Sequence, residues 1–110
     1  MQSVTVLAFA LVFMGVYGVG LAADANAGKL KAQNCAACHG VDGISVVEAF
    51  PSLAGQKKIY LIKQLKDFRV GLRKDTQMTY WAQKLTDADI GDLAEFYSQQ
   101  KCVPANPKLP

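Results

Sequence analysis

Five consecutive residues, Cys35-Ala36-Ala37-Cys38-His39, restrict this 110-residue chain more than any other part of its sequence. C-x-x-C-H is the sequence at which haem is joined covalently to protein. Residues three and four positions apart share one face of a helical turn, so both thiols and the imidazole can point at one flat object. The thiols would add to the two vinyl groups of the porphyrin, and His39 would reach the iron from the same side. The motif therefore predicts one covalently bound haem c.

Other uses of the motif have different requirements. A structural disulfide needs only Cys35 and Cys38, whereas a zinc site of the usual kind needs a second pair of ligands. His39 is the only histidine of the chain. A thioredoxin-like redox site would need a βαβ context, which the sequence does not show. Three residues of such rare types at fixed offsets should coincide in only about one chain in a thousand at ordinary composition, which favours haem.

The first 23 residues differ in composition from the rest of the chain. No charged side chain occurs from Val4 to Ala23, and small residues gather at the end of this apolar run. The pattern predicts a secretory signal peptide over residues 1–23, although no Lys or Arg precedes the run. The run is also long enough to span a bilayer, so an uncleaved N-terminal anchor stays open. We expect an exported, periplasmic protein.

Residues 24–110 are then expected to form one small domain. The hydrophobic core of so small a domain gives only marginal stability by itself, and the apolar faces of a covalently held haem would enlarge this core. All 12 basic and all nine acidic side chains lie in this part of the chain, which leaves a formal net charge of +3. This balance gives no case for nucleic-acid binding.

Hydrophobic spacing predicts an all-α fold with about four helices around the haem. We expect helices over residues 25–37, 57–70 and 80–85, and a last helix that begins after Thr86. Thr86 followed by Asp89 resembles a capping box, although Glu or Gln is the usual third residue. Segment 40–55 is rich in helix breakers and is expected to be a loop.

Met78 is the candidate for the second iron ligand. A methionine opposite a histidine favours Fe(II) and raises the reduction potential of haem. Met78 is the only methionine after the predicted signal peptide, and we expect it in a polar loop between two helices. Packing beneath that loop is the alternative role for a flexible side chain of this kind.

The chain resembles the small bacterial class I c-type cytochromes. It is most similar to single domains of cytochrome c4 and to the cytochrome c553 group. The matching segments occur in the order of that family and cover nearly all of the chain after the signal peptide. They are Ala27-Gly28-Lys29, Cys35 to Gly40, Phe50 to Gln56, Tyr60 to Phe68, Arg73 to Met78 and Leu85 to Ile90. One departure is that cytochrome c4 has two haem domains, whereas this chain provides one.

The resemblance implies a role for each matching residue. Cys35 and Cys38 would form the two thioethers with haem. His39 would be the proximal and Met78 the distal axial ligand of the iron, and Pro51 would line the haem pocket on the histidine side. The resemblance further places Gly28 and Tyr97 where the first and last helices cross.

These expectations lead to a monohaem cytochrome c that carries single electrons between redox partners, and not to an enzyme. The alternative is a haem subunit of a dehydrogenase, which passes electrons on from a flavin or quinone enzyme. A third class, an open iron site that binds gas, would need Met78 to lie off the iron.

The distribution of basic residues and the third cysteine, Cys102, give expectations about binding partners. Lys63, Lys66, Arg69 and Arg73 can form one basic stripe along the second long helix, so we expect an acidic docking surface on one redox partner. A solvated helix face is the simpler alternative. Cys102 is either an inert thiol or part of a disulfide between two chains. We expect a monomer that contacts a membrane only if residues 1–23 are retained.

Overall fold

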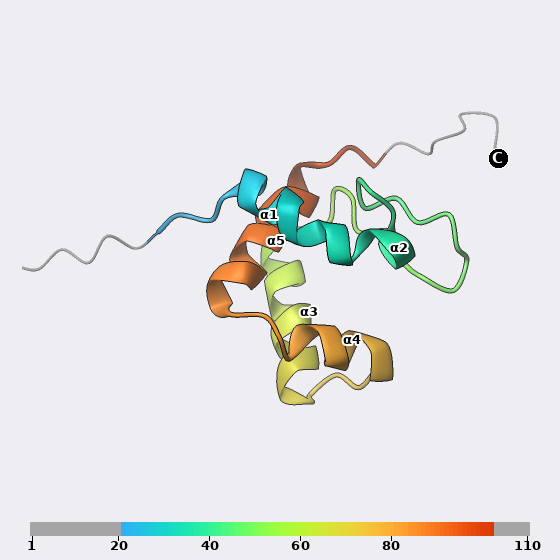
Figure 1. Ribbon diagram of the computed structural model, residues 1–110, viewed down its shortest axis with the longest axis vertical. Coiled ribbons are helices and arrows are strands. Elements are labelled where there is room, and N and C mark those ends of the chain that lie inside the picture. Colours follow the sequence, from blue (N-terminus) through green and yellow to red (C-terminus); the bar gives the residue numbers. More distant parts are fainter. Residues whose placement is uncertain (1–20, 103–110) are drawn as a thin grey trace, which may run out of the picture.

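Helices account for the regular structure of residues 21–102, which are the residues that the computed structural model describes. Within this range the chain has no strand, and the all-α class predicted from the sequence is confirmed (Figure 1). The elements are α1 (Ala25–Lys31), the 3₁₀ turn η1 (Ala32–Asn34), α2 (Ala36–His39), α3 (Lys58–Val70), α4 (Thr76–Ala82) and α5 (Asp87–Gln99). The segment from 40 to 57 contains turns but no helix, as expected.

Side-chain caps explain where the first and last helices begin. The Asp24 carboxylate accepts a hydrogen bond from the Asn26 N–H at 2.8 Å before α1. Before α5, the Thr86 hydroxyl accepts from the Asp89 N–H at 3.1 Å, and the Asp89 carboxylate accepts from the Thr86 N–H at 2.8 Å. This reciprocal pair is the predicted capping box, with Asp in the place usually taken by Glu or Gln.

The helix predicted over residues 25–37 is divided into shorter elements. The backbone tightens in η1, where the Cys35 N–H bonds to the Ala32 carbonyl at 2.9 Å, and α2 follows. Asn34 ends η1, and asparagine is a weak helix former because its side chain competes for backbone hydrogen bonds. The haem motif therefore lies on a separate helical turn between α1 and the loop.

Gly28 lies at the point where α1 and α5 cross, as the resemblance implies. A Cβ at this position would be 2.0 Å from the Asp92 carbonyl oxygen and 2.8 Å from the Cβ of Phe96. Only glycine permits so close a contact between the two backbones. One turn later, the Lys31 ammonium pairs with Asp89 at 2.9 Å and with Asp92 at 2.6 Å. These contacts join the two ends of the domain.

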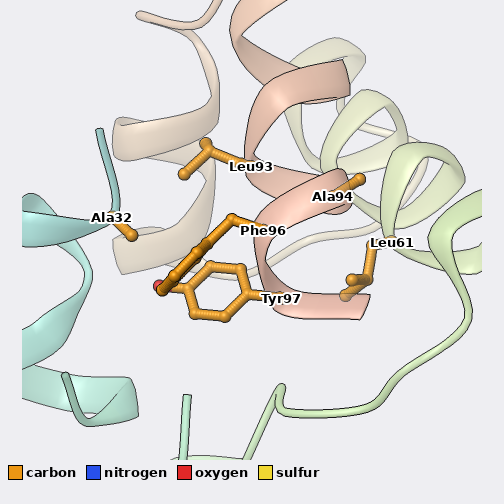
Figure 2. Close-up of a cluster of buried hydrophobic side chains, with 6 residues drawn as sticks. All are labelled: Ala32, Leu61, Leu93, Ala94, Phe96 and Tyr97. Atoms are coloured by element: carbon orange, nitrogen blue, oxygen red, sulfur yellow. The ribbon is translucent and has the colours of Figure 1, made fainter. Parts of the chain in front are cut away.

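The core gathers around α5, and Figure 2 shows its members. The buried side chains of this cluster are Ala32, Leu61, Leu93, Ala94, Phe96 and Tyr97. They come from η1, α3 and α5, so the core joins the beginning, middle and end of the described chain. The rings of Phe96 and Tyr97 have centroids 5.0 Å apart. Tyr97 thus lies beside the residue that contacts Gly28.

α3 buries only part of its apolar surface. Leu61 and Phe68 are buried, whereas Ile59 is 76% exposed. Residues two positions apart do not share a helix face, so Ile59 cannot enter the core together with Leu61. The helix ends at Val70, and the left-handed backbone of the next residue, Gly71 (φ 83°), terminates it.

The helix predicted over residues 80–85 has the wrong bounds. α4 begins at Thr76 and ends at Ala82, so Met78 lies in its first turn and not in a loop. The cause is Asp75, whose carboxylate caps the helix by accepting a hydrogen bond from the Met78 N–H at 2.8 Å. An aspartate ahead of a helix-forming stretch is a start signal that the polar composition of this segment obscured.

The predicted signal peptide lies almost wholly outside the described residues. Of its last members, Leu21 and Ala22 are exposed. Among residues 21–102, no helix has the length and apolar character needed to cross a lipid bilayer.

Candidate functional site

α2 presents the C-x-x-C-H motif on one helical turn. The Cys35 carbonyl accepts hydrogen bonds from the N–H groups of Cys38 at 3.3 Å and His39 at 2.9 Å. This geometry places the three side chains on one face, as the spacing predicts. Both cysteines are free thiols and are partly buried. Within the described part of the chain, no three His, Cys, Asp or Glu side chains converge in the manner of a metal-ion site.

His39 is buried, with 6% of its surface exposed, and its ring is held by the backbone. Its Nδ1 lies 2.8 Å from the Pro51 carbonyl oxygen. A carbonyl oxygen can only accept, so Nδ1 must carry the proton and the lone pair of the neutral ring is on Nε2. Orientation of a ligating imidazole through its other nitrogen is the common arrangement at metal sites. Pro51 therefore acts on His39 through its main chain, a contact that spacing alone did not predict.

Turns within the segment from 40 to 57 bring Pro51 to α2. Gly40 has a φ of 82° and Gly43 a φ of 79°, backbone conformations that side chains disfavour. The Gly43 carbonyl accepts hydrogen bonds from the N–H groups of Leu53 at 2.6 Å and Ala54 at 3.0 Å, which closes the loop. The Ser45 hydroxyl donates to the Cys38 carbonyl at 3.1 Å. The loop is thus fastened directly to the haem motif.

Cys35 faces the core beside Tyr97. Burial raises the pKa of the Cys35 thiol, the neighbouring Tyr97 hydroxyl opposes that change, and Cys38 adds to it. Burial raises the pKa of Tyr97 far above its ordinary value, and Cys35 raises it further. Both groups are therefore neutral at physiological pH in the polypeptide.

Met78 is half-buried in the first turn of α4. In the view of Figure 1, α4 and α2 lie on the same side of α3. Two aromatic residues follow Met78 in α4. Tyr80 is 56% and Trp81 41% exposed, and their rings meet edge to face with centroids 5.4 Å apart. The Lys84 ammonium lies over the Tyr80 ring, 3.6 Å from its centroid.

The predicted basic stripe (Lys63, Lys66, Arg69 and Arg73) is paired within the molecule, and Arg73 lies beyond the end of α3, not on the helix as expected. The pairs are Lys63 with Asp67, Lys66 and Arg69 with Asp87, and Arg73 with Gln64 and the ring of Phe68. The Arg69 guanidinium lowers the pKa of the Asp87 carboxyl below its usual value, and Lys66 adds a smaller effect in the same direction. Lys66 and Arg69 thus hold α3 against the start of α5, whereas Lys63 and Arg73 pair with side chains of α3 itself. The stripe does not by itself identify a docking surface.

Cys102 is an exposed free thiol at the end of the described chain. Its Cβ lies close to Gly55, where an added Cβ would be 3.4 Å away. Both alternatives weighed for this thiol, an inert side chain and a disulfide between two chains, stay predictions.

Comparison with known proteins agrees with this geometry. The family model for cytochrome c matches residues 25–101. Cytochrome c4 of Pseudomonas aeruginosa is 45% identical over 92 residues, which are 83% of this chain and 46% of that protein. Cytochrome c-554(548) of Halomonas halodenitrificans is 45% identical over 83 residues, which are 73% of this chain and 100% of that protein.

A solved structure extends the likeness to the fold. The crystal structure of reduced recombinant cytochrome c4 from Pseudomonas stutzeri has a TM-score of 0.69 and 45% identity, and the match covers 73% of this chain and 47% of that one. This chain spans about half the length of the cytochrome c4 relatives that it matches. The chain therefore belongs to the cytochrome c family, whose cofactor is covalently bound haem c.

Proposed function

We propose that this protein carries single electrons between redox partners through a haem iron ligated by His39 and Met78, with thioethers at Cys35 and Cys38. The observation that carries the proposal is the geometry of His39. Its ring is buried beside the attachment cysteines, and its Nδ1–H donates a hydrogen bond to the Pro51 carbonyl oxygen. The lone pair of Nε2 is therefore left for a metal. Ligation of haem iron explains why a buried histidine follows two free thiols on one helical turn.

The residues present fit a covalently bound haem. The two thiols needed for attachment are free and lie on the same face as His39. The buried hydroxyl of Tyr97 has no hydrogen-bond partner within the described residues. Such groups are rare in folded proteins, and Cys35, to which haem would be attached, packs against the same core cluster as Tyr97. Bound haem would supply an iron that accepts and releases one electron at a time.

The surrounding residues would keep this site unchanged during electron transfer. The Pro51 carbonyl holds the His39 ring in one tautomer, and Asp75 holds the turn that presents Met78. Fixed ligands lower the rearrangement needed when the iron changes its oxidation state. A methionine opposite the histidine would favour the reduced state. This task needs no catalytic acid, base or nucleophile, so we propose an electron carrier and not an enzyme.

We further propose that residues 24–110 form one monomeric domain that acts in the periplasm after residues 1–23 are removed. The support is the apolar, uncharged leader with small residues at its end. A retained leader would instead anchor the domain to the membrane. An acidic docking surface on a partner is supported only by the net charge of +3, since the basic stripe is paired internally.

Production in a host that attaches c-type haem tests the proposal. The intact mass should exceed that of the polypeptide by one haem, and a redox titration followed by absorbance should be reversible with a one-electron slope. Cys35→Ala combined with Cys38→Ala should abolish the added mass, whereas Cys102→Ala, which changes an exposed thiol outside the C-x-x-C-H motif, should retain it. Wild-type protein without the added mass, or without reversible reduction, would contradict the proposal.

A second candidate function is a haem subunit of a dehydrogenase. A protein of Stutzerimonas stutzeri named thiosulfate dehydrogenase electron acceptor is 39% identical over 67 residues, which are 58% of this chain and 31% of that protein. The thiosulfate dehydrogenase structure from Marichromatium purpuratum has a TM-score of 0.65 and 32% identity over 69% of this chain and 18% of that chain. Isolation from the native membrane and periplasm discriminates: a free monohaem protein supports the carrier, and a stable complex with a larger enzyme supports the subunit.

A further inference from the structure

The hydroxyl of Tyr97 is the one buried side-chain oxygen or nitrogen of residues 21–102 that lacks a hydrogen-bond partner. Only 3% of the Tyr97 side chain is exposed, so water does not serve it. An unpaired hydroxyl in a core costs free energy that a phenylalanine of the same shape would not. Within the described residues the hydroxyl therefore forms no hydrogen bond of accepted geometry.

Contacts on several sides keep Tyr97 in place. Its carbonyl accepts a hydrogen bond from the Gly55 N–H at 2.9 Å, and its ring packs on Phe96. The ring also lies so close to Gly43 that a Cβ there would be 2.7 Å from Cδ1. The ring consequently has no room to swing its hydroxyl toward solvent. Figure 2 shows the hydroxyl pointing from α5 toward the side on which Ala32 lies.

The candidate partner for the hydroxyl is the sulfur of Cys35. Cys35 follows η1 directly and packs against the same core cluster as Tyr97. Each side chain affects the pKa of the other, although no hydrogen bond of accepted geometry joins them in the polypeptide. A sulfur with two carbon substituents retains lone pairs and accepts hydrogen bonds weakly, as in methionine. It cannot donate, so in the haem-bound protein the tyrosine must be the donor.

We propose that the Tyr97 hydroxyl donates a hydrogen bond to the Cys35 sulfur in the haem-bound protein and thereby raises the reduction potential of the iron. This inference rests on haem attachment at Cys35, as proposed above. A donor to the sulfur withdraws electron density from the haem to which that sulfur is bonded, which favours Fe(II) over Fe(III). Tyr97 would thus tune the carrier from α5 without contacting the iron.

The test compares Tyr97→Phe with Tyr60→Phe in haem-bound protein. Phenylalanine keeps the buried ring and removes only the hydroxyl, and Tyr60, which is 47% exposed, provides the same change on the surface. At a fixed solution potential near the midpoint, Tyr97→Phe should lower the Fe(II)/Fe(III) ratio by about twofold at most, because only the difference in hydrogen-bond strength between the two oxidation states, a fraction of a weak bond, changes this ratio. The C–S stretching bands of the thioethers in resonance Raman spectra should also shift. Tyr60→Phe should change neither property.

The outcomes separate this inference from the proposed function. If the intact mass of wild-type protein shows no haem, the proposed function fails and this inference fails with it. If haem is attached but Tyr97→Phe leaves the potential and the C–S bands unchanged, only the hydrogen bond is overturned. A changed potential with unchanged C–S bands also overturns the assignment to sulfur. Should Tyr97→Phe not accumulate, wild-type protein matured in D₂O replaces it, and C–S bands identical to those in H₂O overturn the proposal.

Discussion

Replacement of Gly28 by alanine should destabilise the protein, although alanine is the better helix former. Within α1 the change alone would gain about 1 kcal/mol of helix propensity. The added Cβ would however lie 2.0 Å from the Asp92 carbonyl oxygen and 2.6 Å from the carbonyl carbon. Ordinary contacts begin near 3.4 Å, so the α5 backbone would have to retreat by about 1.4 Å.

The expected magnitude follows from what this retreat disturbs. Overpacking of a core costs about 1–3 kcal/mol. Asp92 also accepts the Asp24 N–H at 2.8 Å and pairs with the Lys31 ammonium at 2.6 Å, and loss of one such bond costs about 1 kcal/mol. Against the gain in helix propensity, the net loss is about 2 kcal/mol. For a domain of this size, that corresponds to a Tm lower by about 8–16 °C.

Gly91→Ala is the matched control, because Gly91 also lies inside a helix, in α5. There the nearest heavy atom to an added Cβ is the Cβ of Ala23 at 3.7 Å, an ordinary contact. Its Tm should therefore stay unchanged or rise. Thermal unfolding of both haem-bound variants, followed by far-UV circular dichroism, makes the comparison. Equal Tm values for Gly28→Ala and Gly91→Ala would refute the argument from close contact.

Two further predictions concern the ends of helices. Thr86→Ala removes one half of the capping box and should cost about 1 kcal/mol, seen as a lower urea midpoint; an unchanged midpoint would show that the cap contributes nothing. The hydrogen bond from the Asp24 N–H, and to a smaller extent the bond from Lys31, lower the pKa of Asp92 below its ordinary 3.8. The ionised Asp92 carboxylate therefore stabilises the fold above pH 3.8, and this stabilisation is lost as the pH falls through the folded-state pKa. Asp92→Asn should lower the urea midpoint at pH 7 and reduce the difference between midpoints at pH 7 and about pH 2; an undiminished difference would contradict this assignment.

Local signals made much of the fold predictable. The cap at Thr86 and the apolar spacing after it locate the last helix, and the spacing of Cys35, Cys38 and His39 places their side chains on one face. Both depend on residues within one or two turns of each other. The bounds of α4 were predictable too, from Asp75, but the polar composition around Met78 suggested a loop.

Contacts between distant segments were not predictable from spacing. The bond from His39 to Pro51 depends on a loop that Gly43 closes through its carbonyl, which no periodic pattern reveals. Spacing also could not show that Arg69 of the basic stripe pairs with Asp87, because Asp87 lies 18 positions further along and meets Arg69 only in the folded chain. The resemblance to a family identified Gly28 as a crossing residue, and the structure supplies the reason.

Ligation of the iron by Met78 is the central claim, and the near-infrared absorption of oxidised haem-bound protein tests it most directly. Coordination of Fe(III) by methionine produces a weak band in that region. We expect the band in wild-type protein and in Gln77→Ala, which changes an exposed neighbour in α4, and its loss in Met78→Ala. A wild-type spectrum that is high-spin and lacks the band, or a band that survives in Met78→Ala, would contradict the account, and a high-spin spectrum would favour an open, ligand-binding iron.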